Sequence, residues 1–511
     1  MRRGKSARLA PLFLAMALLT ACGGPEPEAT PEPTPSPFPE ETAEPMPFAL
    51  ACYPNGGFHP ITGSSSINLT LAPLMYRGLF ALDRQFQPRN DLCVSCSVSE
   101  DGLSWTFVLA DAAFSDGSPL TGTEAAASLN LARQSTRYAG RLADIRQVTA
   151  GDGQVTVSLS RPNGALPSLL DVPIVKETGS ADRPLGTGPY FLTGEGENLK
   201  LTARAGAGVP LEEIPLQAVG DSDDLVYAFD AREISLVNTD LTGTNVLGYS
   251  GRFETTDYPT STLLYVGFNT RSGACQDETV RRALSRAFDR EAISGTLMAG
   301  HAVPAVLPIH PGAAEYDAAL AESLGYDPAA ARELLSQAGW TGQEGEKLRR
   351  GRSALELKLV VNQENTYKVS VAESLAGSLE SLGCAVTVEK LPWENFLAAL
   401  ESGSFDLYLG ETTMTADFDP EPLVGEGGSL NYGGFQDAGV DELLNIWRGA
   451  SGEARKEAAS QLYQRIAQLA PIAPVCFKNG SVLTQWGQIT GLAPTQRDVF
   501  AGLEKWNIVQ F

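Results

Sequence analysis

The stretch from residue 355 to residue 388 constrains the fold more than any other part of the chain. Apolar residues recur at 355–361 as in a buried strand, residues 368–382 predict a helix that ends at Gly383, and 384–388 predict a second strand. Strand, helix and strand in direct succession are typical of an α/β layer. We therefore expect an α/β fold.

Other segments support this prediction and add a mixed sheet. Apolar residues at every second position of 154–159, and the run 263–268, predict further strands. Asp277 can cap one helix, and Asp327-Pro328 can start another that Gly339 ends. The first half has the pattern of hairpins, so we expect mixed sheets.

The charge balance excludes one class of partner. The chain has 511 residues, with 38 Lys plus Arg and 61 Asp plus Glu, and a formal charge of −23. Such a polyanion repels phosphate backbones, so we expect no nucleic acid as a partner. With 43% hydrophobic and 19% charged residues, the chain can bury a large core.

The N-terminus has the features of an exported lipoprotein. A positive segment precedes an apolar run, 9–19, that is too short to span a bilayer, so residues 1–21 are predicted to be a cleaved signal peptide. The segment 19–22 (LTAC) resembles a lipobox, which makes Cys22 the predicted lipidated first residue. An ordinary signal peptide, with Cys22 a chance thiol, is the alternative.

Residues 22–47 are predicted to be a tether after the lipidated cysteine. Proline and glutamate alternate there, a composition that favours extended polyproline conformations. No later apolar run is long enough to span a bilayer. We expect a lipid anchor at the extracytoplasmic face of the cell membrane.

Cysteines and histidines do not form a recognisable metal motif. Cys93 and Cys96 are the one close pair of cysteines, and we favour a structural disulfide or two buried thiols there over a metal. His59 and His310 could be nickel ligands, but single histidines beside prolines in loops more often have no role in metal binding. We expect no metal site and no cofactor.

Catalytic constellations are absent from the sequence. There is no G-x-S-x-G, H-E-x-x-H or G-x-x-x-x-G-K motif. Carboxylate pairs such as Asp417 and Asp419 are expected by chance in a chain with 61 acids. A secreted carboxylate-dependent hydrolase is therefore disfavoured, and we expect no catalytic residues.

Motifs in a shared order resemble those of one transport family. The first of them along the chain are 74–83 (LMYRGLFALD), 99–107 (SEDGLSWTF), 114–121 (FSDGSPLT), 184–190 (PLGTGPY), 268–269 (FN), 280–284 (VRRAL) and 288–290 (FDR). The later ones are 326–328 (YDP), 334–340 (LLSQAGW), 393–397 (WENFL), 403–407 (GSFDL), 416–420 (ADFDP), 431–435 (NYGGF) and 440–444 (VDELL). Together they resemble the family 5 solute-binding proteins of ABC importers, which bind peptides, dipeptides or nickel.

The resemblance implies the periplasmic-binding-protein fold, with two lobes, a hinge and an extra inserted domain. The implied limits are lobe I at 48–262 with an insertion at about 71–182, lobe II at 263–475, and a return to lobe I at 476–511. Two strands would cross between the lobes, at 263–269 and 471–477. Closure of the hinge would then bury the ligand and signal to the permease.

Site residues follow from the resemblance by motif. In peptide-binding members the aspartate of the A-D-y motif pairs with the ligand's ammonium and the tryptophan of w-x-x-f-l lies beside the ligand, which implies Asp417 and Trp393. The alternatives are a cap or turn residue for Asp417 and plain core for Trp393. Asn431 and Tyr432 could line the cleft, although a structural role is favoured.

One departure from the family pattern affects the ligand. Members commonly have g-W-x-A-D, whereas this chain has a longer segment without tryptophan at 410–417 (GETTMTAD). Glu411 in this segment could favour a cationic solute, or it could face solvent.

The predicted function is binding, not chemistry. We expect a lipid-anchored protein that delivers a peptide or similar small solute to the permease subunits of an ABC transporter. A sensory or interaction lipoprotein that has the same fold and no importer is the second possibility, and a secreted hydrolase the third.

Overall fold

A computed structural model of the chain describes residues 47–178, 182–343 and 345–509. The predicted signal peptide, Cys22 and the tether up to residue 46 lie outside the described residues. Within the described part, no helix is long and apolar enough to cross a membrane. The predictions for the N-terminus therefore stay predictions.

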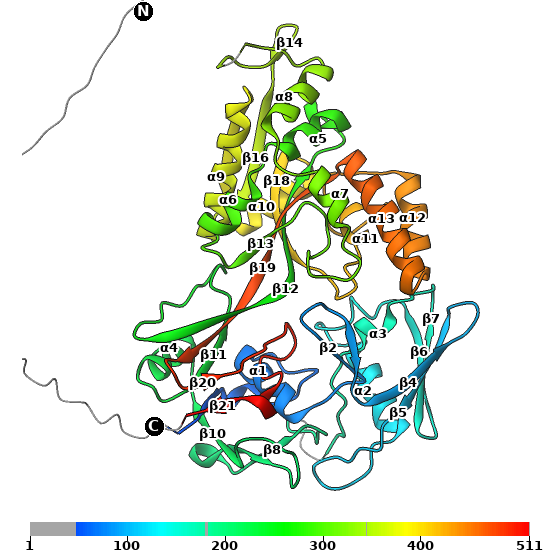
Figure 1. Cartoon of the computed structure of the whole chain (residues 1–511), viewed down its shortest axis with the longest axis vertical. Coiled ribbons are helices and arrows are strands. Elements are labelled where there is room, and N and C mark those ends of the chain that lie inside the picture. Colours follow the sequence, from blue (N-terminus) through cyan, green and yellow to red (C-terminus); the bar gives the residue numbers. More distant parts are fainter. Residues whose placement is uncertain (1–46, 179–181, 344, 510–511) are drawn as a thin grey trace, which may run out of the picture. The chain divides into compact units, whose positions relative to one another are not determined.

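Eleven strands of the described residues form one mixed sheet (Figure 1). Its strand order is β17 (Ala385–Leu391), β16 (Glu356–Asn362), β18 (Leu407–Thr413), β12 (Phe253–Phe268), β19 (Ile472–Gln485), β11 (Leu236–Thr239), β1 (Leu50–Cys52), β10 (Glu213–Ala218), β9 (Lys200–Ala203) and β8 (Tyr190–Thr193), with β13 (Ala302–Pro304) beside β19. Strand β16 is parallel to β17 and β18, and β1 is parallel to β10 and β11, whereas the central pairs are antiparallel. The predicted α/β class and mixed sheet are confirmed.

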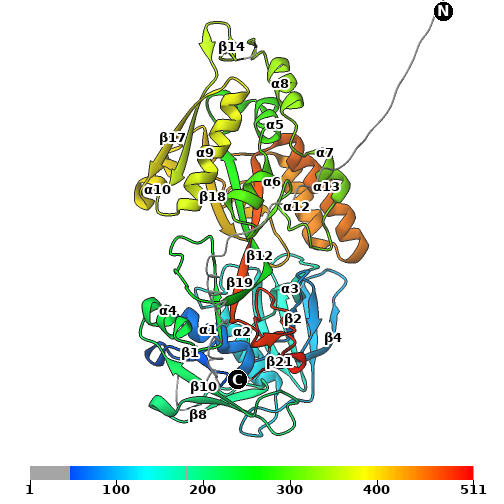
Figure 2. The same ribbon diagram turned by 60° about the vertical axis from the view of Figure 1, so that its left-hand side comes forward.

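The two central strands connect the halves of this sheet. Strands β12 and β19 are 16 and 14 residues long and pair with each other from Phe253–Gln485 to Gly267–Ile472 (Figure 2). The segments expected to cross between lobes, 263–269 and 471–477, lie almost wholly in these strands. The strands are longer than expected because the mostly polar segment 253–257 pairs with 481–485 as well.

A second, four-stranded antiparallel sheet lies early in the chain. Its order is β4 (Cys93–Val98), β5 (Ser104–Leu109), β7 (Gln154–Leu159) and β6 (Ile145–Gly151). Helix α2 (Gly122–Ala132) packs on it and begins with a capping box, in which Thr121 and Glu124 satisfy each other's backbone groups. The hairpin of β2 (Phe80–Leu82) and β3 (Pro88–Asn90) precedes this sheet.

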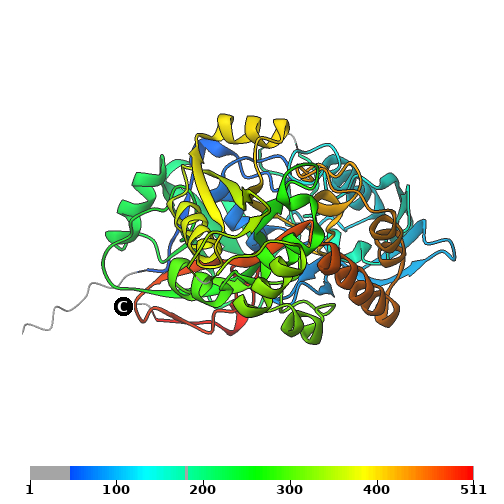
Figure 3. The same cartoon turned by 90° about the horizontal axis from the view of Figure 1, so that it is seen from above.

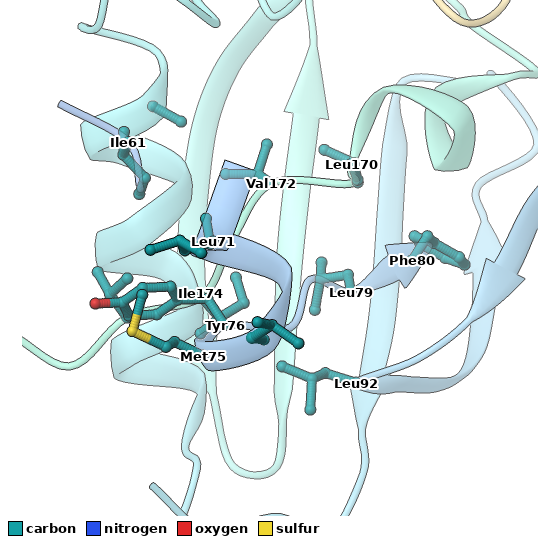
Figure 4. Close-up of a cluster of buried hydrophobic side chains, with 14 of the residues drawn as sticks. Ile61, Leu71, Met75, Tyr76, Leu79, Phe80, Leu92, Leu170, Val172 and Ile174 are labelled. Atoms are coloured by element: carbon teal, nitrogen blue, oxygen red, sulfur yellow. The ribbon is translucent and has the colours of Figure 1, made fainter. Parts of the chain in front are cut away.

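Buried apolar residues form separate cores. One lies around α1 (Ser66–Met75), where Leu71 and Met75 pack with Leu92, Leu170 and Ile174 (Figure 4). Two others lie along β12, β16 and β18, one against the helices α5 (Glu278–Arg286), α8 (Pro328–Gln337) and α9 (Thr366–Ser381) and one against α12 (Ala438–Gly449) and α13 (Gly452–Leu469). The fold thus has a lobe on each side of the β12–β19 pair, while the expected domain limits stay a prediction.

Several helix boundaries agree with the sequence signals. The side chains of Asp277 and Asp327 accept hydrogen bonds from the backbone at the starts of α5 and α8, as predicted. Helix α9 begins at Thr366 rather than at residue 368, because Asn365 caps it. Helices α12 and α13 lie side by side (Figure 3).

The cysteines match neither prediction for positions 93 and 96, a structural disulfide or two buried thiols, because both residues are free and only one of them is buried. Cys93 is buried, but Cys96 is exposed, because it lies in β4, whose outer side chains face solvent. All six cysteines of the described residues are free.

Candidate functional site

A tight turn follows β18 and places Asp417. The backbone N–H of Met414 donates to Ser261 O at 2.9 Å, and the N–H of Phe418 donates to Thr415 O at 2.9 Å. Phe418 has a φ of 54°, in the left-handed region that non-glycine residues rarely adopt. The turn buries the Phe418 side chain and leaves the neighbouring Asp417 carboxyl beside a cavity.

The Asp417 carboxyl group is buried and incompletely paired. Asp417 is 8% exposed, and its Oδ1 has no hydrogen-bond partner among the residues that the structure describes. The N–H of Glu421, the first residue of α11 (Glu421–Val424), donates to Asp419 Oδ1 at 2.9 Å, so Asp419 rather than Asp417 binds the backbone where this helix starts. A buried oxygen without a hydrogen-bond partner costs about 1–3 kcal/mol, so a donor from outside the chain, a ligand or a water molecule, is expected.

The cavity beside Asp417 has a volume of about 190 Å³ and lies where two parts of the chain meet. One wall comes from the β2–β3 hairpin and the segment that leads into α3 (Leu166–Leu169); the other comes from the turn after β18 and the start of α13. Its polar lining consists of Gln87, Ser168, Glu315, Asp417, Arg455 and Lys456.

Aromatic packing holds the two walls together. Phe86, at the tip of the hairpin, has its ring centroid 4.9 Å from that of Phe418 and 5.1 Å from that of His310. Burial lowers the pKa of His310 to about 4, so the ring is neutral at physiological pH. Through its contacts with Phe418 and His310, the Phe86 side chain is part of the hydrophobic core on the other wall of the cavity.

Backbone contact joins the walls at a second point. The N–H of Gly164 donates to Arg448 O at 2.8 Å, and a Cβ on Gly164 would lie 1.9 Å from Ala450 O. Glycine is therefore required at this close approach.

Glu315 is fully paired within the chain. Its Oε1 accepts from Arg455 Nε at 2.7 Å, and its Oε2 accepts from Trp447 Nε1 at 2.9 Å. The Arg455 guanidinium lies over the Trp447 ring, 3.9 Å from its centroid.

Two further carboxylates are also paired. Arg448 Nη2 lies 3.1 Å from Asp419 Oδ2 and 2.9 Å from Glu421 Oε2, and Arg161 makes two hydrogen bonds of 2.8 and 2.7 Å to Glu421. The bonds from Arg161 lower the pKa of Glu421. Burial, with the nearby Asp417 carboxylate adding to it, raises the pKa of Asp419. Of the four acids in this region, Asp417 alone has no cationic partner within the described residues.

Trp393 does not lie at this cavity. It is the first residue of α10 (Trp393–Ser402), it is 53% exposed, and its backbone N–H donates to Glu364 Oε1 at 3.2 Å. Its exposure argues against the alternative of plain core.

Asn431 and Tyr432 lie in the loop after α11, away from the Asp417 cavity. The Asn431 amide donates to Gly425 O and Phe435 O and accepts from the N–H of Phe435, which is a structural role. Tyr432 is half-buried, with its ring 6.0 Å from that of Tyr408. Neither lines the cavity.

Glu411 is paired with lysines. Its Oε2 lies 3.4 Å from Lys368 Nζ and 3.5 Å from Lys478 Nζ, and Lys478 also donates to Asp240 at 2.6 Å. The charge of Glu411 is thus compensated within the chain, and it neither faces solvent freely nor lies at the Asp417 cavity.

A larger cavity, of about 710 Å³, lies among α1, β2 and the C-terminal segment. Its buried acid Asp171 pairs with Arg141 at 2.6 Å and with Arg497 at 2.9 Å. Asp171 is thus paired within the chain, whereas Asp417 beside the smaller cavity has no cationic partner among the described residues.

Sequence reasoning missed most of the cavity. Phe86, Ser168, Glu315 and Arg455 belong to no recognisable motif and are distant from Asp417 in sequence. Their position depends on how the hairpin and α13 meet the turn, which no local pattern encodes.

The fold, two α/β lobes with a cavity between them, is of the periplasmic-binding-protein type. An ABC transporter substrate-binding protein from Sinorhizobium meliloti has the same fold, with a TM-score of 0.73 and 20% identity over 90% of this chain and 99% of that chain. No group of three or more His, Cys, Asp or Glu side chains that could hold a metal occurs among the described residues.

The chain belongs to the bacterial extracellular solute-binding proteins, family 5, whose model matches residues 87–430. This is a family of solute-binding proteins rather than of enzymes. A Brucella ovis protein described as an ABC transporter peptide-binding protein is 28% identical over 284 residues, which are 50% of this chain and 53% of that protein. The chain thus spans about half the length of that relative. The oligopeptide-binding protein AppA of Bacillus subtilis is 21% identical over 88% of this chain and 89% of its own length.

Proposed function

We propose that this protein captures a peptide or a similar small solute with a free amino group and delivers it to the permease of an ABC transporter. The observation that carries the proposal is the buried Asp417 carboxyl, whose Oδ1 has no partner among the described residues. An ammonium group would supply an opposite charge and a hydrogen bond to this carboxyl group.

The relatives support a peptide as the solute. AppA of Bacillus subtilis is named as an oligopeptide-binding protein, and a protein of Shigella flexneri that is 26% identical over 305 residues is named as a glutathione-binding protein. Both kinds of ligand have a free α-amino group, which fits a carboxyl group that has no cationic partner among the described residues.

Thermal unfolding tests the proposal. A mixture of short peptides is expected to raise the melting temperature of the protein, because a ligand that binds only the folded state stabilises it. The same mixture after N-acetylation, and the Asp417→Asn protein with the untreated mixture, are expected to show no rise. Equal stabilisation by acetylated and free peptides would overturn the assignment of Asp417 as an ammonium site.

We propose further that Cys22 carries a lipid that anchors the protein at the extracytoplasmic face of the membrane. The support is the short apolar run followed by LTAC at 19–22. Cys22→Ala is expected to move the protein from the membrane fraction to the soluble fraction of lysed cells. An unchanged membrane fraction would contradict the anchor.

A further inference from the structure

A cavity of about 420 Å³ lies within the lobe that contains α5, α8 and α13 (Figure 2). Its walls come from these helices, from α7 (Ala318–Ser323), from residues 306–308 and from the start of β19. It shares no lining residue with the cavity beside Asp417, so it is a separate site. Its volume falls within the range of about 300–1,000 Å³ that is typical of small-molecule sites.

The apolar walls of this cavity are aliphatic. Leu307, Ile466 and Ile472 belong to the core against α12 and α13, whereas Leu334 packs against the core of α5, α8 and α9. The cavity thus lies at the boundary between two hydrophobic cores, where Leu334 remains half-buried. Among the described residues that line it, Tyr463 is the one aromatic residue. An alkyl chain therefore fits the cavity better than a planar ring, which would gain its contacts by stacking on aromatic side chains.

The cavity has an exposed polar edge. Glu333 and Gln337 of α8 and Gln464 and Gln468 of α13 line it, and all four residues are exposed. The cavity is therefore in contact with solvent, and a small molecule can enter it while the lobe stays folded.

Two arginines of α5 also line the cavity. Arg282 and Arg286 are one turn apart, so they lie on the same face of the helix. Neither forms an ion pair with any residue that the structure describes. The Arg286 guanidinium donates to Ser323 O at 2.5 Å and to Gly325 O at 3.5 Å. The Arg282 guanidinium donates to Thr279 Oγ1 at 3.5 Å, which is a weak contact.

The charges of the lining favour an anion. Among the described residues, Glu333 is the one acid that lines this cavity, and it accepts from Gln337 Nε2 at 3.4 Å rather than from either arginine. The cavity therefore has two guanidinium groups and one carboxylate, in a chain whose formal charge is −23. Arginine binds carboxylates through charge-assisted and often bidentate hydrogen bonds, so a carboxylate is the complementary head group.

We propose that this cavity binds a free fatty acid of medium chain length, with the alkyl chain between the two cores and the carboxylate at Arg282 and Arg286. The inference is independent of the proposed function, because it assigns another ligand to another site. The aliphatic walls supply the affinity for the chain, since they remove apolar surface from water. The arginines select the carboxylate over an uncharged head group.

Calorimetric titration with two probes tests the proposal. Decanoate and decan-1-ol have the same alkyl chain, and decanoate alone has a negative charge. We expect the wild-type protein to bind decanoate at least about tenfold more tightly than the alcohol, the ratio that one hydrogen bond to a charged group provides. Arg282→Met is expected to lower this ratio at least about threefold, and the double substitution Arg282→Met with Arg286→Met to bring it near one.

A nearby arginine supplies the matched control for charge. Arg332 lies on α8 but does not line the cavity, and its guanidinium donates to Gly342 O at 3.2 Å. Arg332→Met removes the same charge from the same lobe and is expected to leave the ratio unchanged.

Two adjacent alanines of α8 test the location of the alkyl chain. Ala330 lines the cavity, whereas Ala329 is exposed and does not line it. Ala330→Phe is expected to weaken the binding of both probes about tenfold, because the ring displaces the equivalent of two buried CH₂ groups. Ala329→Phe is expected to leave both affinities unchanged.

The ratio of two affinities in one variant does not depend on the fraction of folded protein, so a loss of stability cannot imitate the effect of the arginine substitutions. Equal affinities of the wild-type protein for the two probes, or a ratio that survives the double substitution, would overturn the inference. Binding that is unchanged by Ala330→Phe, or the absence of decanoate binding to the wild-type protein, would overturn it as well. None of these results affects the peptide experiments, which test the cavity beside Asp417.

Discussion

The ring of Phe86 lies against that of Phe418 with their planes at 83° and their centroids 4.9 Å apart. Phe86 comes from the β2–β3 hairpin, and Phe418 follows Asp417 directly. This edge-to-face contact closes one side of the cavity, so the position of the hairpin determines whether the site is complete.

Phe86→Ala is expected to destabilise the protein by about 3 kcal/mol, because it removes a buried aromatic ring from a packed core. It should also weaken the stabilisation by free peptides. Chemical denaturation measures the first effect. Val94→Ala, at a side chain that is 54% exposed, is the control and should change the free energy of unfolding by less than about 0.5 kcal/mol. Equal effects of the two substitutions would contradict the role of Phe86.

Glu421→Gln is expected to destabilise the protein by about 1 kcal/mol, a small value because the Arg161 and Glu421 side chains are 37% and 34% exposed. The pKa of Glu421 is lowered in the folded state, mainly by Arg161, so the stabilisation is present at neutral pH and is lost as the pH falls below the ordinary carboxyl range. Denaturation at pH 7 and pH 3 measures this, and the variant should differ from wild type only at pH 7. Glu453→Gln, on a carboxylate that is 88% exposed, is the control.

His310 should make the protein less stable as the pH falls from about 6.5 to about 4. Burial lowers its pKa to about 4 in the folded state, so the unfolded chain takes up a proton over this interval and the folded chain does not. His310→Asn, which keeps an acceptor near the N–H of Gly312, should flatten this part of the stability profile. A slope that is identical in the variant would show that other groups cause it.

Asp498 should make the protein less stable as the pH rises, whereas His310 makes it less stable as the pH falls. Burial raises its pKa to about 6, so its charged form is disfavoured in the folded state, and its contribution to stability declines as the pH rises from about 4 to about 6. Asp498→Asn, which can still accept from the N–H of Phe500, should raise the melting temperature at pH 7 and change it little at pH 4. Glu504→Gln is a nearby control, with a side chain that is 54% exposed, and should have little effect at either pH.

Much of the fold could be predicted from local sequence patterns. The caps at Asp277 and Asp327, the strands at β7, β16 and β17, and the α/β class all depend on residues close together in the chain. The full length of β12 could not be predicted, because its first half is polar and becomes a strand only by pairing with β19.

The candidate site was predictable at one residue. Asp417 lies in a motif. It is a candidate binding residue because Glu315, Asp419 and Glu421 each have an arginine partner and Asp417 has no cationic partner among the described residues. Trp393 lies in a motif too, yet it is not at the cavity, because α10 begins there and leaves its ring half exposed. The candidate binding residue differs from the neighbouring acids in having no ion pair within the described residues, a difference that residue type alone does not reveal.

Native mass spectrometry of the purified protein tests the central claim most directly. We predict that the wild-type protein retains a bound species with a free amino group and that Asp417→Asn, purified in parallel, loses it. A bound species without an amino group, retained equally by both proteins, would contradict the assignment of Asp417 as the residue that binds the solute.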